Sequence, residues 1–119
     1  MSHILLVEGH KVVAQAVKDT LEEEGWHVTL CYDGASAVTR LASDAGYSLL
    51  MFNNQPPNVN GLELVRYARQ LPHRKQTPII MFSVNDYSRD AQQAGANEFL
   101  RKPQDIGKIV KTVARLLDT

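Results

Sequence analysis

Short apolar segments alternate with longer amphipathic segments along the whole chain. The apolar segments cover residues 4–8, 27–32, 48–53, 77–83 and 97–101, and their lengths are typical of β-strands. The longer segments that follow them repeat apolar residues every three or four positions, as helices that bury one face do. Five such pairs predict a doubly wound α/β fold built on a five-stranded parallel sheet.

The apolar residues also indicate which elements are central. The first, third and fourth segments are apolar almost throughout, so we expect these strands to be covered by helices on both faces. The fourth helix, drawn from residues 85–95, is short and has almost no large apolar residue. The other expected core residues are Val13, Val17 and Leu21 before Gly25, Val38 and Leu41 within residues 35–45, Leu62, Val65 and Leu71 after Asn60 and Gly61, and Ile109, Val113, Leu116 and Leu117.

A sheet of this kind has one favoured site, the crevice beyond the carboxyl ends of its central strands. Functional side chains are therefore expected where the strands end. These positions hold Glu8, Gly9, Asn53, Asn54, Ser83, Lys102 and Pro103.

The length and composition fit one globular domain spanning residues 1–119. Of the 119 residues, 44% are hydrophobic and 22% are charged, so we expect neither disorder nor a disulfide-stabilised miniprotein. Thirteen basic and thirteen acidic residues cancel, which argues against nucleic acid as a partner. The single cysteine, Cys31, is expected to be buried and unpaired, which fits a cytoplasmic protein. The N-terminal apolar run is too short for a signal peptide or a membrane span, so we expect no membrane association.

Five segments together resemble the receiver domain of response regulators, the signal-transduction proteins of two-component phosphorelay systems. They are ILLVEGH (4–10), DGASAV (33–38), NVNGLELVRYAR (58–69), TPIIMFS (77–83) and AGANEFLRKP (94–103). They follow the family's order at near-family spacing, and the resemblance runs from about residue 4 to residue 117. It implies the flavodoxin-like strand order 2-1-3-4-5 and a signalling role rather than an enzymatic one.

The resemblance also implies roles for the crevice positions. In receiver domains a histidine kinase transfers a phosphoryl group to an aspartate at the end of the third strand, beside acids that hold Mg²⁺. A lysine neutralises the phosphoryl charge, and a serine or threonine hydrogen-bonds to the group. By position, the nucleophile corresponds to Asn53 and the acidic pair to Glu8 and Gly9. The switch residues correspond to Ser83 and Phe99, and the lysine to Lys102. The resemblance also implies a cis peptide between Lys102 and Pro103.

Two of these positions lack the required chemistry. Asn53 carries a neutral carboxamide with no anionic oxygen to attack phosphorus, and residues 53–60 contain no aspartate or glutamate. Of the three acids that would hold Mg²⁺, Glu8 alone is present, so we expect no magnesium site and no other cofactor. The sequence therefore predicts a pseudo-receiver that is not phosphorylated and acts as a protein–protein interaction module.

Several alternatives stay open at this point. Lys102 is expected to pair with Glu8 or to donate to the Asn53 side-chain oxygen, or else to hold a small anion together with Ser83. The rival functions are a small-ligand or anion sensor and a conventional phosphorylatable receiver, whereas a flavin protein would need a phosphate loop richer than the lone Gly9. The expected partner is a signalling protein, another domain of a longer chain, or a second copy in a homodimer. The chain shows no effector segment after residue 117, so output is expected through binding unless the chain is a fragment.

Charged residues outside the crevice form two clusters. They are either solvated helix faces or docking surfaces for a partner of opposite charge. The acidic cluster is Asp19, Glu22, Glu23 and Glu24, and the basic cluster is Arg66, Arg69, Arg74 and Lys75. The four histidines lack the spacing of a helical metal site and are expected to lie apart, with His10 beside the crevice; the others are His3, His27 and His73.

Overall fold

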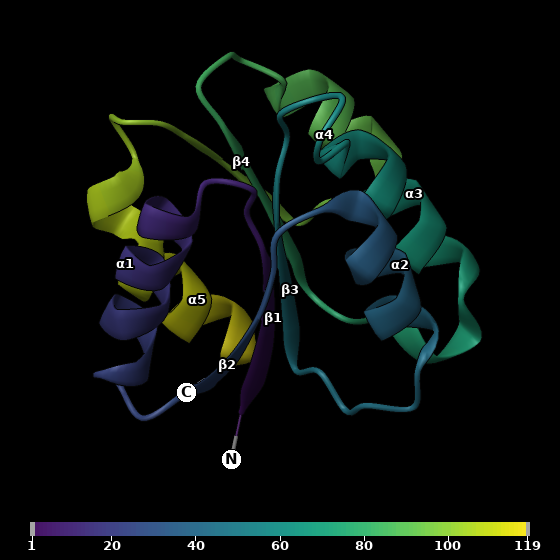
Figure 1. The fold of residues 1–119 in the computed structure, drawn as a ribbon, viewed down its shortest axis with the longest axis horizontal. Coiled ribbons are helices and arrows are strands. Elements are labelled where there is room, and N and C mark those ends of the chain that lie inside the picture. Colours follow the sequence, from purple (N-terminus) through teal and green to yellow (C-terminus); the bar gives the residue numbers. More distant parts are fainter. Residues whose placement is uncertain (1, 119) are drawn as a thin grey trace.

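The computed structural model describes residues 2–118 and contains a five-stranded sheet in the order β2-β1-β3-β4-β5, with every strand pair parallel (Figure 1). The strands are β1 (His3–Val7), β2 (His27–Cys31), β3 (Leu49–Asn53), β4 (Ile79–Ser83) and β5 (Glu98–Arg101). The helices are α1 (Lys11–Glu22), α2 (Gly34–Ala42), α3 (Gly61–Gln70), α4 (Ser88–Ala94) and α5 (Ile109–Leu117), with short 3-10 helices η1 (Pro72–Arg74) and η2 (Ile106–Lys108). The predicted doubly wound fold and its strand order are confirmed.

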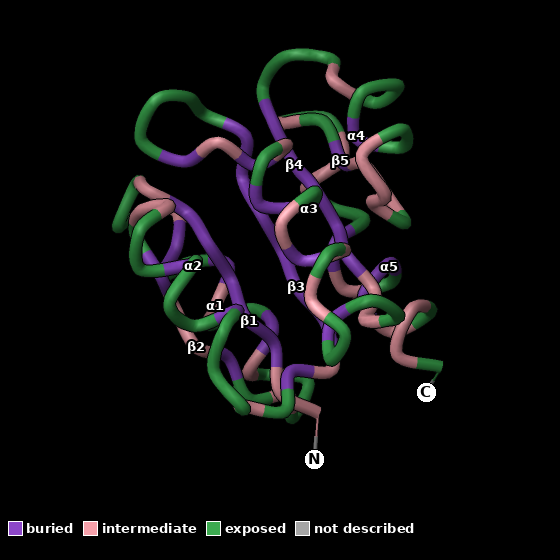
Figure 2. The backbone as a smooth tube through the Cα atoms, turned by 90° about the vertical axis from the view of Figure 1, so that its right-hand side faces the viewer, coloured by how far each residue is buried: buried purple, intermediate pink, exposed green. Residues whose placement is uncertain are grey.

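Helices cover both faces of the sheet. Helices α1 and α5 pack on one face, and α2, α3 and α4 lie on the other (Figure 1). Successive residues of β1 serve the two layers in turn, with Ile4 in one core cluster and Leu5 in the other. Every residue of β3 and β4 is buried, as expected for central strands (Figure 2). Within residues 2–118, no helix has the length and apolar composition needed to cross a membrane.

Two of the expected core positions are wrong. In α2 the buried residues are Ala37 and Leu41, whereas Val38 is 40% exposed. Val38 follows Ala37 by one residue, which turns it about 100° around the helix and away from the sheet. In α3 Leu64 is buried and Leu62 is only half-buried, because the stripe that faces the sheet runs through positions 61, 64, 65 and 68.

The start of α3 is packed directly against the end of β3. The Asn60 side chain caps the helix, because its Oδ1 accepts a hydrogen bond from the Glu63 backbone N–H at 3.1 Å. At the next position, a Cβ added to Gly61 would lie 2.8 Å from the Asn53 carbonyl oxygen. A glycine is therefore required where the helix approaches the strand, and this approach places the β3–α3 loop beside the carboxyl end of the sheet.

Two residues of the basic cluster are not solvated. The Arg69 guanidinium donates five hydrogen bonds, and Arg74, which is 2% exposed, donates to the carbonyl oxygens of Leu41 at 3.1 Å and Ser43 at 2.9 Å. The partners of Arg69 are the carbonyl oxygens of Arg74, Lys75, Thr77 and Gly95 and the Asn97 Oδ1 atom. Burial lowers the pKa of both guanidinium groups. For these two residues the expectation of a solvated or docking face is wrong, because they bind the chain's own backbone.

Candidate functional site: the crevice at the carboxyl end of the sheet

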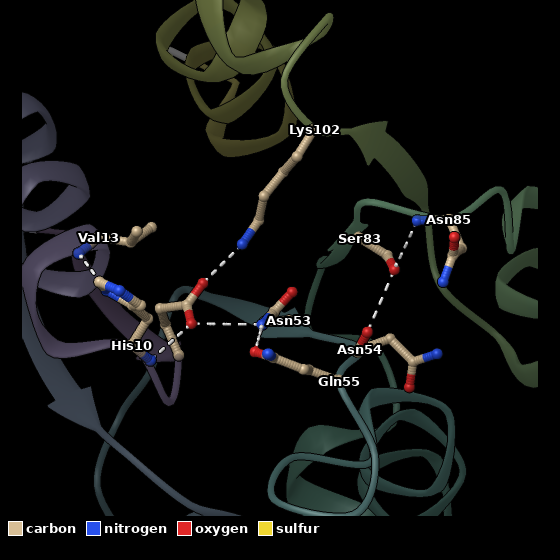
Figure 3. Close-up of polar contacts among 9 residues, drawn as sticks. His10, Val13, Asn53, Asn54, Gln55, Ser83, Asn85 and Lys102 are labelled. Atoms are coloured by element: carbon tan, nitrogen blue, oxygen red, sulfur yellow. Dashed lines mark hydrogen bonds and ion pairs between the residues drawn. The ribbon is translucent and has the colours of Figure 1, made fainter.

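A crevice of about 590 Å³ lies at the carboxyl ends of β1, β3 and β4. Its inner wall contains Glu8, Asn53, Asn54, Ser83 and Lys102, and its more exposed lining includes His10, Val84 and Tyr87. The sequence analysis expected the five inner residues at strand ends, and the structure brings them together (Figure 3). The expected position of His10 beside the crevice is also confirmed.

Glu8 is the buried anion of this crevice and has no exposed surface. Its Oε1 atom accepts a hydrogen bond from Lys102 Nζ at 2.7 Å, in an ion pair that leaves 16% of the lysine side chain exposed. Its Oε2 atom accepts from the His10 backbone N–H at 2.9 Å and from Asn53 Nδ2 at 3.3 Å. Both carboxylate oxygens are therefore satisfied by the chain itself, and the expected pairing of Lys102 with Glu8 is confirmed.

Asn53 ends β3 and is 3% exposed. Its Nδ2 atom donates to Glu8 Oε2 at 3.3 Å and to Gln55 Oε1 at 3.2 Å (Figure 3). The Glu8 carboxylate fixes the orientation of the amide, because the opposite orientation would place the Asn53 oxygen against a carboxylate oxygen. The side chain thus presents an N–H group, not an oxygen, to Glu8.

Lys102 follows β5 and reaches across the crevice to Glu8 (Figure 3). Its ammonium group also lies 4.8 Å from the centre of the Phe82 ring, a cation–π contact. The Lys102–Pro103 peptide is cis, as the family resemblance implies, and Pro103 itself is exposed. Because the formal charges of Lys102 and Glu8 cancel, this pair leaves the inner wall neutral.

Ser83 and Asn54 form a second set of contacts on the opposite wall. The Ser83 hydroxyl donates to the Asn54 carbonyl oxygen at 3.1 Å and accepts from the Asn85 backbone N–H at 3.3 Å. The Asn54 side-chain oxygen accepts from the Leu62 backbone N–H at 3.3 Å, which fixes the orientation of this amide. Within residues 2–118, the Asn54 Nδ2 atom is buried without a hydrogen-bond partner. The crevice wall therefore retains one unsatisfied donor.

Gly9 is covered by the side chain of Asn58, from the β3–α3 loop. A Cβ added at Gly9 would overlap the Asn58 Nδ2 atom, which donates to the Tyr32 carbonyl oxygen at 3.3 Å. No role was predicted for Asn58 or Gln55, because Asn58 only begins the segment of residues 58–69 that resembles the family and Gln55 lies outside all five segments. The available signal was the glycine at position 9, which leaves room for a neighbouring side chain.

Phe99 does not join the crevice. It is half-buried on β5 and lines a separate groove of about 310 Å³ beside α4, together with Ala91 and Glu98. Helix α4 has seven residues and buries Ala91 alone, which confirms the short fourth helix predicted from the sequence. The two switch positions named by resemblance, Ser83 and Phe99, therefore lie in different cavities.

Two histidines meet at the opposite, amino end of the sheet. The parallel register of β1 and β2 pairs His3 with His27, and their rings lie 4.5 Å apart, so the expectation that the histidines lie apart is wrong. His3 Nε2 is 2.6 Å from Thr29 Oγ1. Burial and, next, the neighbouring His27 lower the pKa of His3. Across the described residues, no three histidine, cysteine or acidic side chains are placed to hold a metal ion.

Comparison with known proteins establishes the family. Residues 4–114 match the response regulator receiver domain, and the chain belongs to this family. It is 31% identical over 118 residues to the transcriptional regulatory protein YkoG of Bacillus subtilis, covering 97% of this chain and 50% of YkoG. The chain spans about half the length of the curated relatives it matches.

Solved structures agree with this assignment. The chemotaxis response regulator CheY4 of Vibrio cholerae is 28% identical, with a TM-score of 0.86 and 98% of each chain covered. The receiver domain of the sensor histidine kinase PA1611 of Pseudomonas aeruginosa is 27% identical, also with a TM-score of 0.86, covering 99% of this chain and 98% of that one. The PA1611 domain was solved with a magnesium ion coordinated in its active-site cleft.

Proposed function

We propose that this receiver domain is a pseudo-receiver, which binds a signalling partner without being phosphorylated. The observation that carries the proposal is the side chain at the end of β3, where Asn53 directs an amide N–H toward Glu8 at 3.3 Å. A phosphoacceptor must present an anionic oxygen to the phosphorus atom. An amide nitrogen has its lone pair delocalised into the carbonyl, and its oxygen carries no full charge. Asn53 therefore has no group that can form an acyl phosphate.

The side chains that line the crevice do not provide the ligands that Mg²⁺ needs. This ion keeps an octahedral shell of oxygen ligands and needs carboxylate or phosphate charge to give up water. Among the described residues that line the crevice, Glu8 is the one carboxylate, and both of its oxygens already accept hydrogen bonds. Gly9 offers no side chain, and Asn53 turns nitrogen toward Glu8. We infer that this crevice has no magnesium site, unlike the cleft of the PA1611 domain.

The ion pair between Lys102 and Glu8 supports a crevice held in one state. If Lys102 moved to bind a phosphoryl group, it would leave the fully buried Glu8 carboxylate without a cation. Breaking a buried ion pair on one side costs about 3 to 5 kcal/mol. A fixed crevice is suited to a constitutive docking module, or to one controlled by something other than aspartyl phosphorylation.

The remaining assignments rest on family membership. Asn53 takes the phosphoacceptor position, Glu8 and Gly9 take the acidic positions, and Ser83 and Phe99 take the switch positions. We further propose one domain over residues 1–119 that works in the cytoplasm, has no enzymatic activity and binds neither nucleic acid nor membrane. Its partner is a signalling protein, another domain of a longer chain or a second copy of itself.

Beryllofluoride with Mg²⁺, which mimics a phosphoryl group on aspartate, tests the proposal. We expect no saturable change in the backbone amide signals of Ser83 and Lys102 in a nuclear magnetic resonance titration. The Asn53→Asp variant is the matched control, and we expect a weak response at most, because position 9 still lacks its acid. A saturable change in the unaltered chain would restore a conventional phosphorylatable receiver.

A small-ligand sensor is the second candidate, and the unpartnered Asn54 Nδ2 atom favours it. A ligand with a carbonyl or carboxylate oxygen would satisfy this donor once a shift of the Asn54 side chain exposed it to the crevice, because the atom is covered in this structure. The test is a thermal-shift titration with acetate and with inorganic phosphate. An increase in the unfolding midpoint that Asn54→Ala and Lys102→Ala both abolish would establish the sensor, and no increase with either anion would reject an anion site.

A further inference from the structure

We infer that Asn58 restricts which side chain position 9, beside the crevice, can carry, because its carboxamide lies where the Cβ of a second acidic residue would have to be. The inference rests on the proposed function and deepens it: the second acidic residue of a metal site is missing at position 9, and the Asn58 side chain also opposes its return. Gly9 and Asn58 form a matched pair, which we call the closure.

The first observation is steric. A Cβ built on Gly9 would overlap the Asn58 Nδ2 atom and would lie 3.4 Å from both Asn58 Cγ and the Tyr32 carbonyl oxygen. The positive-φ glycines of the described chain are Gly25 and Gly95, so the backbone at Gly9 can accept a larger residue. The conflict at position 9 therefore comes from the end of the exposed Asn58 side chain, which would have to rotate and give up its hydrogen bond to make room for a Cβ.

The second observation is that Asn58 is held in place at both ends. Its side chain donates to the Tyr32 carbonyl oxygen at 3.3 Å, and its own carbonyl oxygen accepts from the Gly34 backbone N–H at 3.1 Å. Tyr32 follows β2, and Gly34 is the first residue of α2. The β3–α3 loop is thus tied across Gly9 to the end of β2 and the start of α2.

The third observation is that the loop itself is closed. The backbones of Gln55 and Val59 exchange two hydrogen bonds, with N···O distances of 2.7 and 3.1 Å. Gln55 also accepts from Asn53 at 3.2 Å, so the same loop contacts the end of β3. Hydrogen bonds therefore connect the β3–α3 loop to the end of β3 and to the segment between β2 and α2.

This arrangement predicts that charge alone does not rebuild a metal site. The double variant Gly9→Asp/Asn53→Asp restores both missing acids, but the carboxylate introduced at position 9 has to displace the Asn58 amide and its hydrogen bond to Tyr32. Adding Asn58→Ala removes that obstacle. Asn85→Ala is the control, because Asn85 is likewise an exposed asparagine near the crevice but is not among the atoms nearest to a Cβ at Gly9.

Mg²⁺ titrations of these variants, followed by the backbone amide signals near residues 53 and 102, test the closure. We expect the triple variant with Asn58→Ala to bind Mg²⁺ about tenfold more tightly than the double variant, the equivalent of one displaced hydrogen bond. The Asn85→Ala control should match the double variant. Equal Mg²⁺ affinity with and without Asn58 would overturn the inference, while leaving the proposed absence of phosphorylation in the unaltered chain untouched.

A second measurement uses smaller changes that keep the native charge. Gly9→Ala should lower the thermal unfolding midpoint, and Asn58→Ala in the same chain should remove most of that loss. A Gly9→Ala loss of the same size in the presence and absence of the Asn58 side chain would show that the two residues are independent and would contradict the closure.

Discussion

Basic side chains are wholly or partly buried at both ends of the sheet, but their hydrogen-bond acceptors differ. At the carboxyl end, Lys102 pairs at 2.7 Å with the fully buried carboxylate of Glu8. At the amino end, Arg69 and Arg74 donate to peptide carbonyls and one side-chain amide, and within residues 2–118 neither lies within ion-pair distance of a carboxylate. The basic side chain at the carboxyl end is paired with a carboxylate, whereas those at the amino end donate hydrogen bonds mainly to backbone carbonyl oxygens.

This difference in acceptors distinguishes the amino end, which belongs to the scaffold of the fold, from the carboxyl end, which contains the candidate site. Carbonyls at the ends of α2 and η1 need donors in any sequence that folds this way, and an arginine supplies several at once. An ion pair is different, because both partners can be replaced together by neutral groups at little cost, whereas the loss of one partner is expensive. The amino end therefore belongs to the scaffold, while the carboxyl end keeps a pair of charges whose joint removal the fold can tolerate.

The largest expected effect comes from breaking the ion pair on one side. Lys102→Met leaves the Glu8 carboxylate buried and uncompensated, so we expect the free energy of unfolding to fall by about 3 kcal/mol. Chemical denaturation at neutral pH measures this change.

The double variant Glu8→Gln/Lys102→Met is the control for that prediction. It removes both charges and keeps an acceptor for Asn53, so most of the lost stability should return. If the double variant is as unstable as Lys102→Met, packing rather than charge holds the carboxyl end, and the contrast between the two ends is incorrect.

A smaller loss is expected at the amino end. Arg69→Met removes five donated hydrogen bonds from a half-buried group, for an expected loss of about 2 kcal/mol. Arg66→Met, on an exposed position of the same helix, should change the free energy of unfolding by less than about 0.5 kcal/mol. Equal effects at the two positions would mean that the backbone carbonyls do not need the Arg69 guanidinium.

The smallest effect is a dependence of stability on pH at the amino end. Burial and the neighbouring His27 lower the pKa of His3 in the folded protein, so the unfolded chain binds the proton more readily. The His3 contribution to stability is therefore complete above the ordinary histidine pKa of 6.5 and is lost as the pH falls through the lowered folded value.

Thermal unfolding across mildly acidic pH measures this contribution. His3→Asn should flatten the decline in the unfolding midpoint below the ordinary histidine pKa. A His3→Asn variant that loses stability on acidification as steeply as the unaltered chain would show that another group is responsible.

The sequence was sufficient for the parts of this structure that depend on periodicity. The five strands, their central members and the short fourth helix followed from apolar patterning, because a buried strand and a half-buried helix place apolar residues at different intervals. The gathering of Glu8, Asn53, Ser83 and Lys102 around one crevice followed from the parallel sheet, whose strands end at one edge. The strand order came from the family resemblance instead.

Apart from the pairing of Lys102 with Glu8, the contacts between distant segments described above were not predicted from the sequence. Arg69 and Arg74 bind carbonyl oxygens of α2, η1 and Thr77, and the direction of these carbonyls is set only when the chain folds. In the sequence, a basic helix end that binds such carbonyls cannot be told from one that faces water. The Asn58 amide over Gly9 is a contact between residues 49 positions apart, and the glycine itself is a weak signal because it does not say which side chain lies against it. The type of each side chain indicated which interactions it can make, and the packing of the folded chain determined its partners.

The most direct test of the pseudo-receiver proposal is intact-mass spectrometry of the unaltered chain after incubation with acetyl phosphate and Mg²⁺. The account predicts a single species at the unmodified mass, because the group at the end of β3 is an amide that faces Glu8. A species heavier by one phosphoryl group, mapped to the crevice on any side chain, would contradict it.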